Sequence, residues 1–168
     1  MLVLYVCFIR RRGLSEDVGH EVSTNGFWPF DRSAYVIRRR ANFPSTRQSI
    51  NDAVVVILEV ARRCGCSPDQ EADLEIALRE ALANAVIHGN EEDEGKGVFV
   101  RCYGGSDKTL ILVRDEGAGF EPSDIPDPRG SDRVQLDHGR GLFLMRALMD
   151  QVEYRRRGRE VLLFKRWS

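Results

Sequence analysis

One helical segment constrains the fold more than any other part of the sequence: SPDQEADLEIALREALANAVIHGN, residues 67–90. It opens with a serine that can cap a helix, a proline suited to the first turn, and acidic residues that favour the helix dipole. It closes at Gly89 and Asn90. One apolar stripe recurs at helical spacing along it, formed by Leu74, Leu78, Ala81 and Ala85. The segment therefore predicts a helix with one face packed on a core.

A row of polar residues borders this apolar stripe: Glu80, Asn84 and His88. Each step of four residues turns an α-helix by only about 40° beyond a full turn, so the three side chains lie nearly above one another. Burying an unpaired polar group costs about 1–3 kcal/mol, and more for a charge. Something should therefore satisfy Glu80 and Asn84. Taken alone, the row allows either local capping and a salt bridge to an arginine, or a functional site.

Composition narrows the class of protein. The chain has 168 residues, of which 42% are hydrophobic, enough for one domain with a real core. A formal net charge of −1 gives no overall attraction to nucleic acid or to a membrane surface. The cysteines fit no zinc-binding pattern and are expected to be reduced and structural: Cys7, Cys64, Cys66 and Cys102.

The N-terminus carries no convincing targeting signal. Its apolar run, MLVLYVCFI, is far shorter than the roughly 20 residues of a membrane span. The positive charges follow this run, whereas those of a signal peptide precede it. We expect a cytoplasmic chain without a membrane anchor. Residues 1–32 are expected to form a poorly specified leader, and residues 33–168 to form the folded domain.

The other segments predict the order strand, two helices, hairpin, loop, helix, hairpin. Ser45 or Thr46 can cap the first helix, and Gly65 follows as its stop signal. The expected elements are a strand at 34–43, helices at 47–64 and 68–89, strands at 97–105 and 108–117, a helix at 139–150 and a hairpin over 151–167. This order predicts an α+β fold, a two-layer sandwich with a mostly antiparallel sheet covered on one face by helices.

Two glycine-containing motifs follow the helical segment. In VRDEGAGF, Asp115 ends an apolar strand, and Gly117 and Gly119 would let the backbone approach a flat ligand. In HGRGLFLM, Gly139 and Gly141 come immediately before the predicted helix, where free backbone N–H groups can bind phosphate. Each motif alone also fits an ordinary turn or helix start. The long loop between them is of a kind that is usually a functional lid or disordered.

Three motifs, in this order and at these distances, resemble the N, G1 and G2 boxes of the GHKL superfamily. They are EALANAVIHGN, DEGAGF and GRGLFLM. This ATP-binding fold is shared by gyrase-type ATPases and histidine kinases. Within it, residues 33–168 look most like the small bacterial anti-sigma-factor serine kinases. The glycine fingerprint of Rossmann folds and the Walker A lysine motif are both absent, so the sequence does not support those nucleotide-binding folds.

The resemblance assigns roles to the polar row. Asn84 would hold the Mg²⁺ that bridges the phosphates of ATP, and Glu80 would be the general base for the attacking hydroxyl. Asp115 would accept a hydrogen bond from the adenine amine, and Gly117 and Gly119 would shape the adenine pocket. For His88 the resemblance leaves open a phosphate contact, a packing role or a role at the helix end.

The resemblance places further residues around the nucleotide. Gly139, Arg140 and Gly141 would meet the phosphates, with Arg140 adding charge. Phe120 and Leu142, which complete the two glycine motifs, would also belong to the nucleotide site. The lid over ATP would be 120–138, and its closure would exclude water.

The resemblance implies an ATP-dependent serine/threonine kinase that phosphorylates an anti-sigma-factor antagonist on serine and binds a sigma factor in a partner switch. It also implies a homodimer and no direct contact with nucleic acid. One alternative is a module that binds ATP and a partner without transferring phosphate. Another is an ATP-binding component of a two-component-like pathway, although the residues before 33 offer no helix with a phosphoacceptor histidine. A gyrase-type ATPase would need a second domain.

Overall fold

A computed structural model describes residues 34–119 and 137–167 of the chain. The predicted leader therefore lies outside the described residues, and so do residues 120–136 of the predicted lid. The elements, in chain order, are β1 (Ile37–Pro44), α2 (Arg47–Arg63), α3 (Pro68–Ala83), the π-helix η2 (Asn84–Gly89), β2 (Gly97–Gly104), β3 (Lys108–Arg114), α4 (Asp137–Leu148), β4 (Gln151–Arg155) and β5 (Glu160–Arg166).

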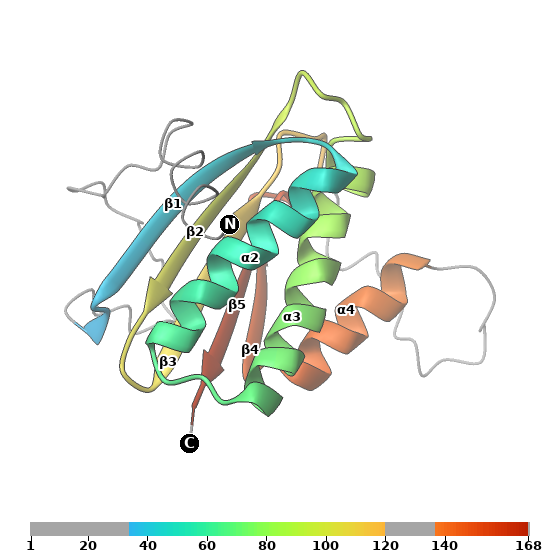
Figure 1. The fold of residues 1–168 in the computed structure, drawn as a ribbon. Helices are drawn as coiled ribbons and strands as arrows, with labels where there is room; N and C mark the ends of the chain where they lie inside the picture. The colour runs from blue at the N-terminus through green and yellow to red at the C-terminus, as the bar shows by residue number, and fades with distance from the viewer. Residues whose placement is uncertain (1–33, 120–136, 168) are drawn as a thin grey trace, which may run out of the picture.

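The strands form one antiparallel sheet in the order β1-β2-β3-β5-β4. Helices α2, α3 and α4 lie side by side over one face of this sheet (Figure 1). The predicted α+β architecture, an antiparallel sheet covered on one face by helices, is confirmed. Both predicted hairpins are present, as β2–β3 and as β4–β5.

The helix starts follow the capping signals in the sequence. Thr46 caps α2, because its hydroxyl accepts a hydrogen bond from the backbone N–H of Ser49 at 3.2 Å. Ser67 caps α3 in a reciprocal capping box with Gln70. Each cap satisfies backbone N–H groups that have no acceptor within the helix. Helix α2 is followed by Gly65 with a φ of +86°, a conformation that glycine adopts without strain.

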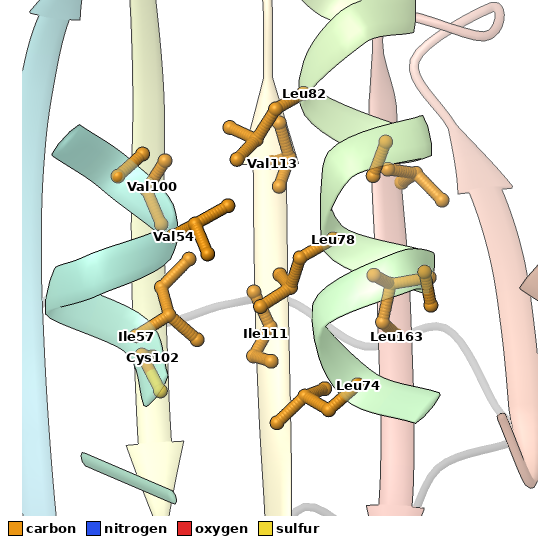
Figure 2. Close-up of a cluster of buried hydrophobic side chains, with 14 of the residues drawn as sticks. Val54, Ile57, Leu74, Leu78, Leu82, Val100, Cys102, Ile111, Val113 and Leu163 are labelled. Carbon is orange, nitrogen blue, oxygen red and sulfur yellow. The ribbon is translucent and has the colours of Figure 1, made fainter. Parts of the chain in front are cut away.

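The core lies between the helices and the sheet. Side chains from α2, α3 and the central strands point toward one another there (Figure 2). Those labelled in Figure 2 are Val54, Ile57, Leu74, Leu78, Leu82, Val100, Cys102, Ile111, Val113 and Leu163. The predicted apolar stripe is confirmed, since Leu74, Leu78, Ala81 and Ala85 are all buried. Burial of this stripe holds the polar row in place at the edge of the core.

The predicted helix over residues 68–89 does not stay α-helical. It changes to a π-helix at Asn84, where the backbone N–H of Asn90 donates to the carbonyl of Ala85 at 2.9 Å. A π-helix turns less per residue than an α-helix, and such turns occur frequently at functional sites. Glu80 and Asn84 are half-buried at the core margin as predicted, whereas His88 is exposed.

Helix α4 begins earlier than predicted, at Asp137 rather than at Gly139. The last two residues of the predicted lid, 137 and 138, therefore belong to this helix. Gly139 lies in its first turn, where backbone N–H groups lack acceptors within the helix. Gly141 lies inside the helix, within the predicted bounds 139–150.

Two further findings concern membrane-spanning helices and the cysteines. Within 34–119 and 137–167, no helix is long and apolar enough to span a bilayer. Three of the four cysteines lie in these ranges, and all three are free thiols: Cys64, Cys66 and Cys102. Burial raises the pKa of the Cys102 thiol to about 12, so Cys102 behaves as a small apolar core residue.

Candidate active site

The first half of the candidate site forms where the end of α3 meets α4. A Cβ added to Gly141 would lie 2.6 Å from Oε2 of Glu80 and 3.8 Å from Nδ2 of Asn84. With glycine at this position, the backbone of α4 comes close to the Glu80 carboxylate, and a larger residue would require the Glu80 side chain to move. Glu80 and Asn84 therefore share one junction with Gly141, which lies far from them in the sequence.

The structure does not support a local salt bridge as the reason for Glu80. Its neighbour Arg79 pairs with Glu75 at 2.8 Å and also donates to Oδ1 of Asn51 at 2.9 Å. Among the ion pairs between described residues, none includes Glu80. A half-buried carboxylate that makes no such pair is available to a ligand or to a substrate hydroxyl.

A tyrosine that the sequence interpretation missed completes this junction. Tyr154 of β4 packs against the core, and its hydroxyl lies near the side chain of Asn84. Burial raises the pKa of Tyr154 to about 12, although the nearby Asn84 side chain and the charge of Arg146 act in the opposite direction. The alternation of β4 could have placed Tyr154 on the core side with Val152, but its position near Asn84 depends on the tertiary packing.

The second half of the site surrounds Asp115, just beyond the end of β3. Its backbone N–H donates to the carbonyl of Arg159 at 3.0 Å, and its Oδ1 accepts from the N–H of Gly117 at 2.8 Å. Burial raises the pKa of the Asp115 carboxyl, while the bond from Gly117 opposes that rise. Burial removes hydrogen bonds that water would donate to this carboxylate. A ligand amine that donates to the carboxylate would replace them.

Glycines bring the Asp115 loop directly onto the end of the π-helix. A Cβ on Gly89 would lie 2.6 Å from Cγ of Asp115, and one on Gly117 would lie 1.8 Å from the carbonyl oxygen of Gly89. Gly119 has a φ of +82° and packs on the backbone of Arg157. A Cβ added to Gly119 would lie 2.2 Å from the carbonyl oxygen of Arg157. Gly117 and Gly119 thus shape this loop. The sequence interpretation treated Gly89 only as a helix end.

Asn90 fixes the same loop and was also missed. It is fully buried, its Nδ2 donates to the carbonyl of Gly97 at 3.0 Å, and its Oδ1 accepts from the N–H of Glu116 at 2.8 Å. One amide therefore ties the end of η2 to the start of β2 and to the Asp115 loop. In the sequence, Asn90 resembles an ordinary residue of a helix end, so no local pattern distinguishes it.

Replacing Asn90 with alanine is expected to lower the free energy of unfolding by about 1–3 kcal/mol, because it removes two partly buried hydrogen bonds to backbone groups and leaves a gap at a fully buried position. Thermal and urea unfolding measure this loss. The matched control is Asn42→Ala, which removes an exposed amide from β1 and should change stability by less than about 0.5 kcal/mol. Equal stability of the two variants would contradict the bridging role of Asn90.

The remaining predicted residues lie in different surroundings. Arg140 is exposed on α4, close to the junction with Glu80. Leu142 is buried in the hydrophobic core, so its side chain anchors α4. Phe120 lies outside the described residues. The structure therefore brings together Glu80, Asn84 and Gly141 at one junction and Asp115, Gly117 and Gly119 in one loop, with η2 between them.

The residues at the Glu80 junction fit a magnesium–nucleotide complex better than a metal cage made of protein ligands alone. Within the described ranges, no group of three or more His, Cys, Asp or Glu residues could hold a metal ion. Mg²⁺ usually keeps several waters and is held by few side chains together with substrate phosphates. The amide oxygen of Asn84 suits such a hard cation.

Comparison with known proteins agrees with this geometry. Residues 43–165 match the model of the histidine kinase-like ATPase domain. The chain is 39% identical over 99 residues to the serine-protein kinase RsbW of Bacillus subtilis, which covers 55% of this chain and 62% of that protein. It is 30% identical over 116 residues to RsbW of Halalkalibacterium halodurans, covering 66% and 70% of the two chains.

A third relative carries a different name. The chain is 30% identical over 105 residues to an anti-sigma F factor of Clostridium perfringens, covering 60% of this chain and 75% of that protein. The match to the Bacillus subtilis kinase spans less than two thirds of that relative's length. The family match, by contrast, includes every described residue of the candidate site and all five strands in whole or in part. The chain belongs to the histidine kinase-like ATPase domain family.

Proposed function

We propose that this protein is an ATP-dependent serine/threonine kinase and anti-sigma regulatory factor. The observation that carries the proposal is the meeting of Glu80 and Asn84 with the backbone of α4 at Gly141. A module that only binds nucleotide has no need for a half-buried carboxylate next to the amide that would hold Mg²⁺. The names of the relatives, serine-protein kinase and anti-sigma F factor, support the same function.

In the proposed reaction, Glu80 accepts the proton of a substrate serine as the serine oxygen attacks the γ-phosphorus of ATP. The bond from that phosphorus to the β–γ bridging oxygen breaks, and ADP leaves. The Asn84 amide would hold Mg²⁺, which when bound neutralises phosphate charge. Gly139, in the first turn of α4, offers its backbone N–H to phosphate, and Arg140 adds positive charge.

Asp115 would select adenine. Its carboxylate can accept a hydrogen bond from the exocyclic amine, and the close packing of Gly117 on Gly89 holds it in place. Guanine presents a carbonyl oxygen at the same position, and this oxygen has no proton to donate to the carboxylate. Guanine should therefore bind more weakly than adenine. Three further predicted members of the nucleotide site stay predictions: Phe120, His88 and the lid at 120–138.

The proposed protein partners are an anti-sigma-factor antagonist, phosphorylated on serine, and a sigma factor that is bound when the antagonist is phosphorylated. We also propose a cytoplasmic homodimer. Val36, 83% exposed next to β1, offers an apolar contact for a second copy. Direct binding to nucleic acid is not expected, because the net charge is −1.

The test is a transfer assay with radiolabelled ATP, Mg²⁺ and the candidate antagonist encoded nearest to this protein. We expect label on a serine of the antagonist, and no label on an antagonist whose candidate serine is replaced by alanine. Tight ATP binding without transfer to any antagonist encoded in the same genome would contradict the kinase assignment and favour the non-catalytic module. Absence of ATP binding would contradict both.

A further inference from the structure

The sheet has a second apolar face, turned away from the three helices (Figure 1). Successive side chains of a strand point to opposite faces, so β2, β3 and β5 each contribute to both. The side chains that do not enter the helix-side core form a separate buried group with Tyr35. This outer cluster consists of Tyr35, Tyr103, Leu110, Leu112, Leu162 and Phe164. Its three leucines are only 3–4% exposed.

Such burial requires a layer above the sheet. Leu112 lies opposite Leu162 in the sheet register, and Leu110 is flanked by aromatic residues on both neighbouring strands. Neighbours of this kind stand beside a side chain and shield its flanks, but they leave its tip uncovered. Within residues 34–119 and 137–167, the helices lie on the opposite face and every strand belongs to the sheet itself. The outer cluster therefore needs a covering segment.

Residues 1–33 join the described chain at this cluster. The ring of Tyr35 meets that of Tyr103 edge-on, with 6.0 Å between centroids, and Ala34 packs against the same cluster. A Cβ on Gly105 would lie 2.7 Å from the carbonyl oxygen of Ala34, so the backbone lies close against the β2–β3 turn there. Five strands about 4.8 Å apart are crossed by roughly seven residues of extended chain. The leader is therefore tethered beside the outer cluster and is long enough to cross it.

The composition of the leader suits this position. Its run MLVLYVCFI, residues 1–9, fits neither a membrane span nor a signal peptide, and an uncharged run rich in β-branched and aromatic residues favours aggregation when exposed. The charges agree as well. The β1 side of the outer face is basic, with Arg40 directly opposite Arg101. Acidic residues lie between the run and Ala34: Glu16, Asp17, Glu21 and Asp31.

From these observations we infer that the leader is part of the folded domain and that its apolar run, residues 1–9, packs across the outer cluster. The inference goes beyond the proposed kinase reaction and does not depend on it. The outer face is then closed to other proteins. The edge of β1, where Val36 is exposed, stays open for the proposed second copy.

Cys7 lies within the run and serves as the reporter. The experiment measures how fast a maleimide modifies Cys7 in the full-length protein, with the modified peptide identified by mass spectrometry. The double variant Leu4→Asp, Phe8→Asp places two carboxylates in the run, and their burial would be too costly for the run to stay docked. We expect Cys7 to react at least about tenfold more slowly in the wild type than in this variant, because a docked thiol reacts only after local opening. The new carboxylates disfavour the thiolate, so they cannot cause the faster reaction.

The matched control is the double variant Ser15→Asp, Ser23→Asp, which adds the same charge to the leader outside the run. Its Cys7 should react as slowly as that of the wild type. Leu110→Ser tests the other partner of the contact and should speed the reaction of Cys7, whereas Val55→Ser, on the exposed side of α2, should not. Cys102 is buried in the helix-side core, so it stays unmodified in every variant that is folded.

Equal reaction rates of Cys7 in the wild type and in Leu4→Asp, Phe8→Asp would overturn the inference. If Leu110→Ser then also dissociated a dimer in analytical ultracentrifugation, a second copy rather than the leader would be the cover. Slow labelling that persists in both Leu110→Ser and the run variant would also overturn it, because Cys7 would then be shielded somewhere else. Failure of the proposed kinase function would leave all of these rates unchanged, so the two tests are independent.

Discussion

Exchanging Glu80 for glutamine is expected to slow phosphotransfer to the antagonist by about 10²- to 10⁴-fold, the usual contribution of a positioned general base. The amide has nearly the shape of the carboxylate, so the close approach of Gly141 to Oε2 at this junction can be kept. It cannot accept the serine proton, however. ATP affinity should therefore stay close to that of the wild type. Single-turnover transfer and nucleotide titration measure the two quantities separately.

Glu75→Gln is the matched control for this prediction. It makes the same chemical change on the same helix, but at a carboxylate that forms a partly exposed ion pair with Arg79. Such pairs contribute little to stability, so transfer and ATP binding should both be unaffected. A Glu80→Gln protein that phosphorylates the antagonist at the wild-type rate would refute the assignment of Glu80 as the base.

Replacing Gly117 with alanine is expected to disrupt the Asp115 loop. The new Cβ would lie 1.8 Å from the carbonyl oxygen of Gly89 and 2.5 Å from its carbonyl carbon, and both atoms belong to the backbone. Side chains can rotate away from such a collision, whereas these atoms move only if η2 or the loop shifts. We expect a loss of about 1–3 kcal/mol in the free energy of unfolding, as for other overpacked sites.

The same shift should weaken nucleotide binding by about 10- to 100-fold, because it displaces the Asp115 carboxylate from its hydrogen-bonding position. Thermal unfolding and nucleotide titration measure the two effects. Gly95→Ala is the control: its Cβ would approach only Oδ1 of the exposed Asp93, at 3.1 Å, and that side chain can move. Wild-type nucleotide affinity in Gly117→Ala would show that the close contact with Gly89 is not required.

Local patterns in the sequence predicted the elements well, since their causes are local. Thr46 and Ser67 cap helices because each hydroxyl reaches a backbone N–H three residues later. The apolar stripe of α3 is buried because helical spacing places its members on one face. The sheet order could not be predicted in this way, because pairing of β3 with β5 joins segments separated by α4 and β4.

The largest local error concerns the end of the helix over 68–89. The sequence predicts an uninterrupted α-helix there, since nothing in ANAVIHG opposes it. The change to a π-helix at Asn84 comes with contacts to distant segments, as Asn90 bonds both Gly97 and Glu116. Those contacts stabilise a wider turn that local propensity does not favour.

By itself, the sequence determined which face of α3 is buried and that Glu80 and Asn84 lie together at its edge, because a helix repeats every 3.6 residues. Only the tertiary structure decided what surrounds them. Gly141 approaches Glu80 from α4, and Gly89 receives the backbone of Gly117. These contacts join residues that are distant in the chain, and they depend on how helices and sheet pack rather than on any spacing within one segment.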